Sequence, residues 1–385
     1  MRMISISTLL LACCFVSGAA TSQIGPAPWQ SSTIEAGVFV TEVAQVLESY
    51  EYGNGQSNET QHVAYSIDSG GTGLVRYARR SRSNGAAWPA TWTVDPGALI
   101  CSEPSLAVGN DGRVFLSCVT DMKVLVYWRA SNGTFTLGLA DTGAPEARNG
   151  AVALHYYSSG ALRGIHIAYQ KRNANGSRIV AHRWCSAFPN CQTPSSWSGD
   201  EVPLSNPSPA RVGLVASTGY VQVAVPKSAD VWFYRWYPIG GWDGSGQKPA
   251  FGSVTGPIDE VAFKRNVYGK LAAVTAGTSA YLVEWDTQQD YPRQYSKASG
   301  SDIVDTDHID VLFADGPKPV LVYQVDGAED LTIARRSPIG NWEREVVVSS
   351  GEVGRWPRLD QDVDSKYVIT HFDRSLSRLR SVVGN

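Results

Sequence analysis

Residues 166–184 read HIAYQKRNANGSRIVAHRW, and residues 62–80 read HVAYSIDSGGTGLVRYARR. Each stretch opens with a histidine, continues as an alternating apolar run, crosses a turn rich in small polar residues, and ends in a second alternating run. Two alternating runs on either side of such a turn predict a pair of antiparallel strands. The chain therefore contains a hairpin that occurs more than once.

The second run of this hairpin recurs seven times, with starts 45 to 55 residues apart. The copies are LVRYARR, VLVYWRA, IVAHRW, VWFYRW, YLVEWD, LTIARR and LSRLRS, starting at Leu74, Val124, Ile179, Val231, Tyr281, Leu331 and Leu376. Each follows another strand-like run, with a third strand ahead of it. A short fourth strand usually follows and opens with a tryptophan. Four antiparallel strands in a unit of this length predict the blade of a β-propeller.

The last unit ends at LRSVVGN without a fourth strand. Its counterpart lies at the other end of the chain, where PAPWQSSTIEAG, from Pro26, reads like NWEREVVVSSG, from Asn341. An N-terminal strand that joins the C-terminal blade would remove the exposed sheet edge and close the ring. The sequence thus predicts an all-β fold, a seven-bladed propeller of four-stranded antiparallel blades that forms one domain over residues 21–385.

The N-terminus reads MRMISISTLLLACCFVSGAATSQ. Arg2, the apolar run over residues 4–16 and the small residues 17–20 together predict a secretory signal peptide over residues 1–20. The run is too short to cross a bilayer, and we expect no membrane span elsewhere. A lipid-anchored or periplasmic form processed at Cys13 is the second interpretation. We therefore expect a secreted protein.

Four of the six cysteines lie outside this segment. Cys185 and Cys191 are six positions apart in one loop and are expected to pair locally, which leaves Cys101 to pair with Cys118. Cys101 precedes the first strand of its unit and Cys118 ends the second, so antiparallel neighbours can bring them side by side. Two disulfides are typical of an oxidising compartment.

The charge balance and the motif content exclude several classes of function. The formal net charge of −3 lacks the basic excess of nucleic-acid-binding proteins, so no nucleic-acid partner is expected. The sequence contains no phosphate-binding loop, GxSxG elbow, HExxH motif or paired CxxC motif. We therefore expect neither a cofactor nor a metal.

The HxAY phrase, the LxYxR phrase with its following tryptophan, and the cysteine loop in one blade resemble secreted seven-bladed propellers of the lectin and sialidase-like type. The resemblance covers nearly the whole mature chain. The same superfold includes polysaccharide lyases that act on uronate-containing glycans. The resemblance therefore implies an extracellular glycan or acidic polysaccharide as partner, and leaves binding and cleavage both open.

The repeat offers a test of the candidate site residues, because a residue that recurs in its column belongs to the scaffold. His166 shares its column with His62. His182 departs from a column that tyrosine otherwise fills at positions 77, 127 and 234, and Glu284 departs from it in the fifth unit. Strand direction places His155, His166 and His182 at one rim of the third blade. The candidate catalytic residues are His182, His166, Tyr169, Arg183 and Arg235, and the candidate ligand-binding residues are His155, Trp184, Trp236 and Glu284.

Several roles are open to this group. A histidine base, a tyrosine acid and an arginine that neutralises a uronate carboxylate could carry out β-elimination, as in the lyases. Three histidines could also bind zinc. Arginine and histidine could instead donate hydrogen bonds to a glycan that stacks on Trp184 or Trp236. Polar residues at strand ends can also serve the scaffold alone. We expect glycan binding at a rim site around blades 3 and 4, with a uronate lyase as the alternative and a protein-binding scaffold third.

Overall fold

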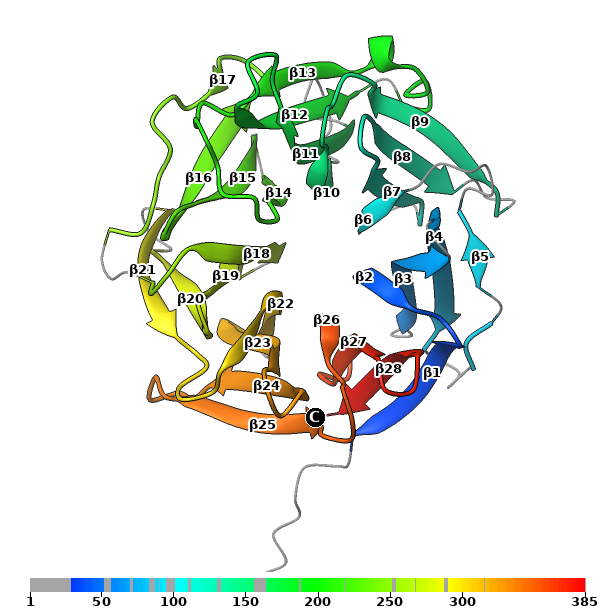
Figure 1. Cartoon of the computed structure of the whole chain (residues 1–385), viewed down its shortest axis with the longest axis vertical. Coiled ribbons are helices and arrows are strands. Elements are labelled where there is room, and N and C mark those ends of the chain that lie inside the picture. Colours follow the sequence, from blue (N-terminus) through cyan, green and yellow to red (C-terminus); the bar gives the residue numbers. More distant parts are fainter. Residues whose placement is uncertain are drawn as a thin grey trace, which may run out of the picture.

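The computed structural model describes residues 29–51, 57–69, 72–82, 87–89, 91–94, 101–109, 112–129, 133–155, 164–186, 188–217, 219–250, 254–266, 268–286, 290–314 and 316–384. The predicted signal peptide lies outside the described residues. Within them, the strands form seven antiparallel four-stranded sheets arranged as a ring (Figure 1). The predicted seven-bladed β-propeller is confirmed.

Each blade follows the chain from the central channel outward. Blade 1 contains β2 (Val40–Glu51), β3 (Ser57–Ser69), β4 (Thr72–Ser81) and β5 (Trp92–Thr93), and blade 2 contains β6 (Ser102–Val108), β7 (Val114–Val119), β8 (Val124–Arg129) and β9 (Phe135–Asp141). Blade 3 contains β10 (Arg148–His155), β11 (Gly164–Arg172), β12 (Arg178–Cys185) and β13 (Ser198–Glu201), with the short 3-10 helix η1 (Pro194–Ser196) before β13. Blade 4 contains β14 (Gly213–Ser217), β15 (Tyr220–Lys227), β16 (Asp230–Tyr237) and β17 (Gly241–Trp242).

The second half of the ring repeats this order. Blade 5 contains β18 (Ile258–Asn266), β19 (Gly269–Ala276), β20 (Ser279–Asp286) and β21 (Tyr291–Lys297), and blade 6 contains β22 (Val304–Ala314), β23 (Lys318–Val325), β24 (Asp330–Arg336) and β25 (Trp342–Val348). Blade 7 contains β26 (Arg355–Gln361), β27 (Tyr367–Asp373), β28 (Arg378–Gly384) and, as its outermost strand, β1 (Gln30–Ala36).

The N-terminal strand closes the ring as predicted. β1 pairs antiparallel with β28, from Gln30 opposite Val383 to Ala36 opposite Arg378. Figure 1 shows the blue first strand beside the red last strand at the bottom of the ring. Because β28 has β1 on its outer side, its backbone N–H and C=O groups do not form an open sheet edge.

The hydrophobic core lies between the blades. Seven clusters of buried side chains each join one blade to the next, and the last cluster joins blade 7 to blade 1. Strands β7 and β27 are buried along their whole length because both faces pack against neighbouring blades. Successive residues of a strand point to opposite faces, so neighbouring residues in sequence contact different blades. This alternation decides which candidate site residues can meet.

One polar contact between blades recurs around the ring. The hydroxyl of Tyr323 in blade 6 donates to Asp302 at 2.9 Å, where Asp302 follows the fourth strand of blade 5. Tyr65 donates in the same way to Glu35 of blade 7, and Tyr169 donates to Asp141 of blade 2. Tyr169 is therefore a recurring scaffold residue.

Blade 2 has a disulfide at the corresponding place. Cys118 occupies the position in β7 that tyrosine occupies in β3 and β11, and it bonds to Cys101, with Cα atoms 5.8 Å apart. The second predicted disulfide, Cys185 to Cys191, is also present, with Cα atoms 5.9 Å apart. Both predicted pairings are confirmed. In the part of the chain that the structure describes, no helix is long and apolar enough to span a membrane.

Candidate functional site

The two histidines of blade 3 form a buried pair. His166 and His182 are both 0% exposed. The Nδ1 atom of His166 lies 3.1 Å from Nε2 of His182, and the rings stack with centroids 5.3 Å apart. Trp184 stacks on His182, and Trp236 from blade 4 packs edge-on against the same ring. The prediction of histidines presented at an open rim is therefore wrong, because blade 4 covers them.

Burial also sets the charge of His182. Desolvation by burial lowers the pKa of His182 well below its usual value, and the neighbouring charges of His166 and Arg183 lower it further. At neutral pH a neutral imidazole is the form that such an environment stabilises. Trp236 is 3% exposed, whereas Trp184 is partly exposed. An imidazole enclosed by tryptophans in this way serves packing better than proton transfer to a ligand.

Blade 1 contains the counterpart of this pair. The Nδ1 atom of His62 lies 2.6 Å from the hydroxyl of Tyr77, and its Nε2 atom lies 2.9 Å from Glu48. His62 and His166 face the following blade in the same way, and both bond to a side chain of the third strand. His155 ends β10 at the backbone position that corresponds to Glu48. The side chain of His155 lies outside the described part of the structure, so its predicted role stays a prediction.

The alignment column in which His182 departs from tyrosine contains residues that lie on two different faces of the blades. Tyr77 and Tyr127 belong to one cluster between blades 1 and 2, although they come from opposite sides of it. Tyr234 likewise packs toward blade 3, the blade before its own. A shift of one residue in an alignment moves a side chain to the other face of its strand. Only Tyr77 is the structural counterpart of His182.

The other candidate catalytic residues lie on different faces. Tyr169 and Arg183 face blade 2, where both bond to Asp141, while His166 and His182 face blade 4. Arg235 lies on the far side of blade 4, facing blade 5. The predicted convergence of five catalytic side chains is therefore wrong, and the reason is the alternation of side chains along β11, β12 and β16. Burial and the nearby Asp141 carboxylate also raise the pKa of Tyr169.

Glu284 lies still further around the ring. Its carboxylate accepts from Gln294 at 2.8 Å and pairs with Arg336 of blade 6 at 2.8 Å. Glu284 is thus separated from the histidines by the whole of blade 4 and by its own blade.

Arg235 is part of a second polar group, at the edge between blades 4 and 5. We call this group the Asp290 cluster; its members are Tyr220, Arg235, Lys270, Trp285 and Asp290. Tyr220 and Lys270 open their strands, while Arg235 and Trp285 lie near the ends of theirs. Antiparallel strands bring these positions to one edge of the two blades.

Four donors converge on the carboxylate of Asp290. Lys270 Nζ lies 2.6 Å from Oδ1 and the Tyr220 hydroxyl donates to Oδ2 at 2.6 Å. Trp285 Nε1 donates at 3.1 Å, and Arg235 Nη2 lies 3.2 Å away. Desolvation raises the pKa of Asp290, but hydrogen bonds from Lys270 and Tyr220 and the positive charges of Lys270 and Arg235 outweigh it and lower the pKa. The cluster thus forms a carboxylate-binding environment, which in this structure is occupied by the side chain of its own residue Asp290.

The cluster carries a net positive charge and unused donors. Its side chains contribute two cations and one carboxylate. Burial lowers the pKa of Lys270 to about 8, so its ammonium remains mostly protonated at neutral pH. Arg235 Nε and the buried Gln222 Nε2 have no hydrogen-bond partner among the described residues. Arg235 and Gln222 lie opposite each other in the β15–β16 pair, so both donors belong to the same face.

The Asp290 cluster remains accessible from outside. The side chain of Asp290 is 41% exposed and that of Arg235 is 16% exposed. Tyr220 and Tyr237 are partly exposed, with ring centroids 5.7 Å apart. Aromatic rings beside charged hydrogen-bonding groups suit the apolar faces and hydroxyl edges of sugars.

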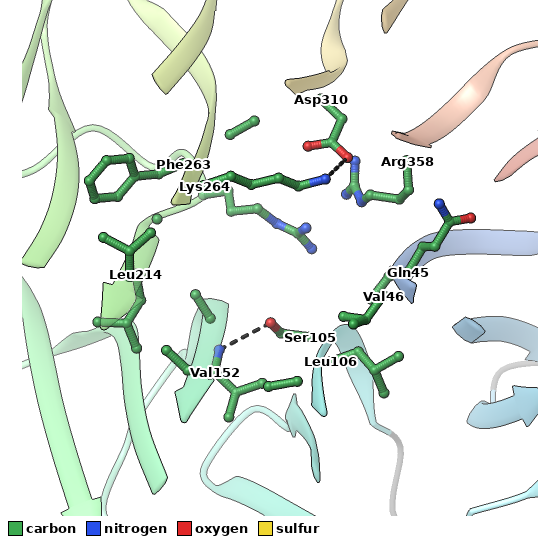
Figure 2. Close-up of a pocket in the computed structure, with 18 of the residues that line it drawn as sticks. Gln45, Val46, Ser105, Leu106, Val152, Leu214, Phe263, Lys264, Asp310 and Arg358 are labelled. Carbon is green, nitrogen blue, oxygen red and sulfur yellow. Dashed lines mark hydrogen bonds and ion pairs between the residues drawn. The ribbon is translucent and has the colours of Figure 1, made fainter. Parts of the chain in front are cut away.

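A cavity of about 410 Å³ lies in the central channel, lined by first strands of the blades (Figure 2). Lys264, Asp310 and Arg358 lie at the top of the view, and Leu106 and Val152 lie opposite them. None of the predicted site residues is among the described residues that line it. The repeat is clearest in the second and third strands, so this group of first-strand residues was not predicted from the sequence.

A signal for the channel residues exists in the first strands. Glu42, Glu260, Asp310 and Arg358 are charged residues of the first strands of blades 1, 5, 6 and 7, and Ser105 is a polar residue of the first strand of blade 2. Some of them connect blades: Asp310 accepts from the Leu359 N–H at 2.7 Å, as Ser105 does from Val152 at 3.0 Å. Charged residues repeated in the first strands would have indicated a polar group in the channel.

Comparison with known proteins finds distant structural neighbours only. No protein-family model matches the sequence, and no curated protein matches it. Among solved structures, a protein of unknown function from Dyadobacter fermentans DSM 18053 is 9% identical, with a TM-score of 0.50 over 94% of this chain and 98% of that chain. The WD40 domain of SCAP from fission yeast is 7% identical, with a TM-score of 0.49 over 92% of this chain and 87% of that chain.

A carbohydrate-active enzyme of family AA12 from Trichoderma reesei is 11% identical, with a TM-score of 0.44 over 93% of this chain and 96% of that chain. At such identities the likeness concerns the fold alone. The described part of the chain is a seven-bladed β-propeller by its own sheets. The fold does not define the function, which depends on the side chains of this protein.

Proposed function

We propose that this protein is an extracellular carbohydrate-binding propeller that binds an acidic glycan at the edge of blades 4 and 5. The observation that carries the proposal is the Asp290 cluster, where Arg235 and Lys270 stand beside partly exposed aromatic rings. A uronate carboxylate would pair with the net positive charge, and a sugar face would pack on Tyr220 or Tyr237. The two disulfides are compatible with an extracellular location.

The same geometry favours binding over cleavage. β-Elimination needs a base, an acid and a carboxylate-neutralising arginine around one sugar. Here the two histidines face one side of blade 3, Tyr169 faces the other, and Arg235 faces blade 5. A single bound sugar cannot contact all of these groups. Incubation with polygalacturonate, alginate and hyaluronan should therefore give no rise in ultraviolet absorbance from an unsaturated uronate.

The direct test is a titration of the purified, oxidised protein with the same three polymers, with neutral dextran for comparison. Arg235→Ala should weaken binding of the preferred acidic polymer at least about tenfold, the size of one lost charge-assisted contact. Binding should also weaken as salt is raised, because the attraction is between exposed charges.

Arg335→Ala is the matched control. Arg335 pairs with Glu345 at 2.6 Å and lies over the Tyr367 ring at 4.9 Å, much as Arg235 pairs with Asp290 and lies over Tyr220 at 5.1 Å. It belongs to blade 6, away from the proposed site, so its loss should leave binding unchanged. Equal effects of the two substitutions, or preference for dextran, would contradict the proposal.

A further inference from the structure

The central channel has two chemically different walls. Leu106, Val108, Val152 and Leu214, from blades 2 to 4, form an apolar wall. The facing wall, from blades 5 to 7 and blade 1, carries charged side chains and one amide, as Figure 2 shows for Lys264, Asp310, Arg358 and Gln45. A cavity of about 410 Å³ lies between them, within the range of about 300–1,000 Å³ that small-molecule sites occupy.

Much of the polar wall is used to hold the ring together. Arg358 Nε donates to the Val43 carbonyl at 2.7 Å and Nη1 donates to the Pro357 carbonyl at 2.8 Å. Lys264 Nζ lies 2.6 Å from Asp310 and donates to the Leu359 carbonyl at 2.6 Å. These contacts fix the side chains in position whether or not the channel is occupied.

Other groups of the same wall are not saturated. Arg358 is 7% exposed, and its Nη2 atom has no hydrogen-bond partner among the described residues. It lies 3.7 Å from Glu260 and 3.8 Å from Glu42, beyond hydrogen-bond distance from both carboxylates. Asp360 accepts from Gln45 at 3.1 Å, lies 3.9 Å from Lys264, and keeps 23% of its side chain exposed. The wall thus contains one unpartnered arginine nitrogen and one partly exposed carboxylate, both held by fixed neighbours.

The charges of the wall balance. Arg211, which precedes β14, pairs with Glu42, Arg358 lies near Glu260, Lys264 lies between Asp310 and Asp360, and Arg265 supplies the fourth cation. A free anion would meet these carboxylates and a free cation would meet the guanidinium groups, so neither is favoured. A neutral molecule with several hydroxyl groups can donate to the carboxylates and accept from Arg358 at once. Its C–H faces can pack on the apolar wall.

We propose that the central channel is a second binding site, for one small neutral polyol such as a free mono- or disaccharide. The site is separate from the Asp290 cluster, which lies at the outer edge of blades 4 and 5, and it does not depend on the acidic-glycan proposal. A buried arginine with one unpartnered nitrogen, a partly exposed aspartate and an apolar wall around one cavity are the observations that carry it.

The test uses isothermal titration of the full oxidised protein with glucose, galactose, mannose, maltose, cellobiose and myo-inositol. Glucuronate and glucosamine serve as the anionic and cationic counterparts. We expect one or more of the neutral molecules to bind with a stoichiometry of one, and the charged analogues of the same ring to bind at least about tenfold more weakly. Binding of glucuronate in preference to the neutral sugars, or no binding by any neutral compound up to millimolar concentrations, would overturn the proposal.

Substitutions at two positions, Ala151 and Asp360, test whether binding takes place in the channel. Ala151→Phe fills the cavity from the apolar wall and should abolish binding, whereas Ala151→Ser keeps the volume small and should preserve it. Asp360→Asn keeps the shape, removes the charged acceptor and should weaken binding about tenfold. If the Ala151→Phe variant does not fold, the Asp360→Asn variant alone tests the channel site. Binding that persists in Asp360→Asn with unchanged affinity would overturn the proposal.

Arg235→Ala separates the two proposals. It should leave binding of the neutral sugar unchanged, because Arg235 faces blade 5 rather than the channel. Loss of neutral-sugar binding in this variant would place the sugar at the Asp290 cluster and overturn the channel site. Loss of acidic-polymer binding alone would leave the channel site standing.

Discussion

At the scale of the residue, the direction of each side chain decides its role more than its place in a motif. His182 and Arg183 are neighbours in sequence, yet one faces blade 4 and the other faces blade 2. Arg235 is a candidate that the sequence predicts, but the positions of Lys270 and Asp290 beside it were not predictable, because those residues belong to the next blade. Contacts between blades depend on tertiary packing, which a single repeat unit does not encode.

Lys270 should make acidic-glycan binding depend on pH. Burial lowers the pKa of its ammonium to about 8, so the cluster loses one positive charge as the pH rises through this value. Affinity for the acidic polymer should be nearly constant from pH 6 to 7 and should fall between pH 7.5 and 9. Titrations between pH 6 and 9 test this prediction, and an affinity that rises between pH 7.5 and 9 would contradict it.

His182→Tyr tests the packing role of the buried pair. A tyrosine hydroxyl could bond to His166 as Tyr77 bonds to His62, but the larger ring meets Trp184 and Trp236. We expect a loss of about 1–3 kcal/mol in unfolding free energy from overpacking, with acidic-glycan binding unchanged. Denaturant unfolding measures the stability and the polymer titration measures the binding. Abolished binding with full stability would contradict the packing role and restore His182 as a site residue.

At the scale of the element, the repeat period and strand pattern were sufficient to predict the blades. Alternation and turn residues are local properties, so the four strands of each unit followed from the sequence. The recurring tyrosine contacts between blades were not predictable from one unit, because the acidic partner of each tyrosine lies at the end of the preceding unit. Comparison of Tyr65, Tyr169 and Tyr323 with Cys118 shows that one site between blades accommodates either a hydrogen bond or a disulfide.

Loss of the blade 2 disulfide should be measurable on its own. The Cys101–Cys118 bond closes a loop with a sequence separation of 17, and cross-links over loops of about 15 residues stabilise by about 3 kcal/mol. The double variant Cys101→Ser, Cys118→Ser should lower the unfolding free energy by about that amount and retain a folded ring. Denaturant unfolding under oxidising conditions checks it, and a change below about 1 kcal/mol would contradict the account.

At the scale of the whole molecule, ring closure was predictable because the first and last strands resemble fragments of one unit. The position of the cavity was not predictable, because it depends on how the seven first strands approach one another. Their charged residues were visible in the sequence, but only the ring brings Arg358 of blade 7 near Glu260 of blade 5 and Glu42 of blade 1.

Removal of β1 should disrupt the ring as a whole. A chain that begins at Val38 lacks the strand that pairs with β28, so blade 7 would expose an unpaired edge and lose Ile34 from the core between blades 7 and 1. We expect aggregation or loss of cooperative unfolding, observed by size-exclusion chromatography and thermal denaturation. A chain that begins at Thr21 is the control and should unfold cooperatively. Equal behaviour of the two chains would contradict the closure argument.

The measurement that most directly tests the central claim is hydrogen–deuterium exchange of the protein with and without the acidic polymer that it binds best. Binding at the Asp290 cluster predicts slower exchange at the start of β15, the end of β16, the start of β19 and the segment from Asp290 into β21, with blades 1, 2, 6 and 7 unchanged. Slower exchange confined to other blades, or no protection under saturating polymer, would contradict the claim.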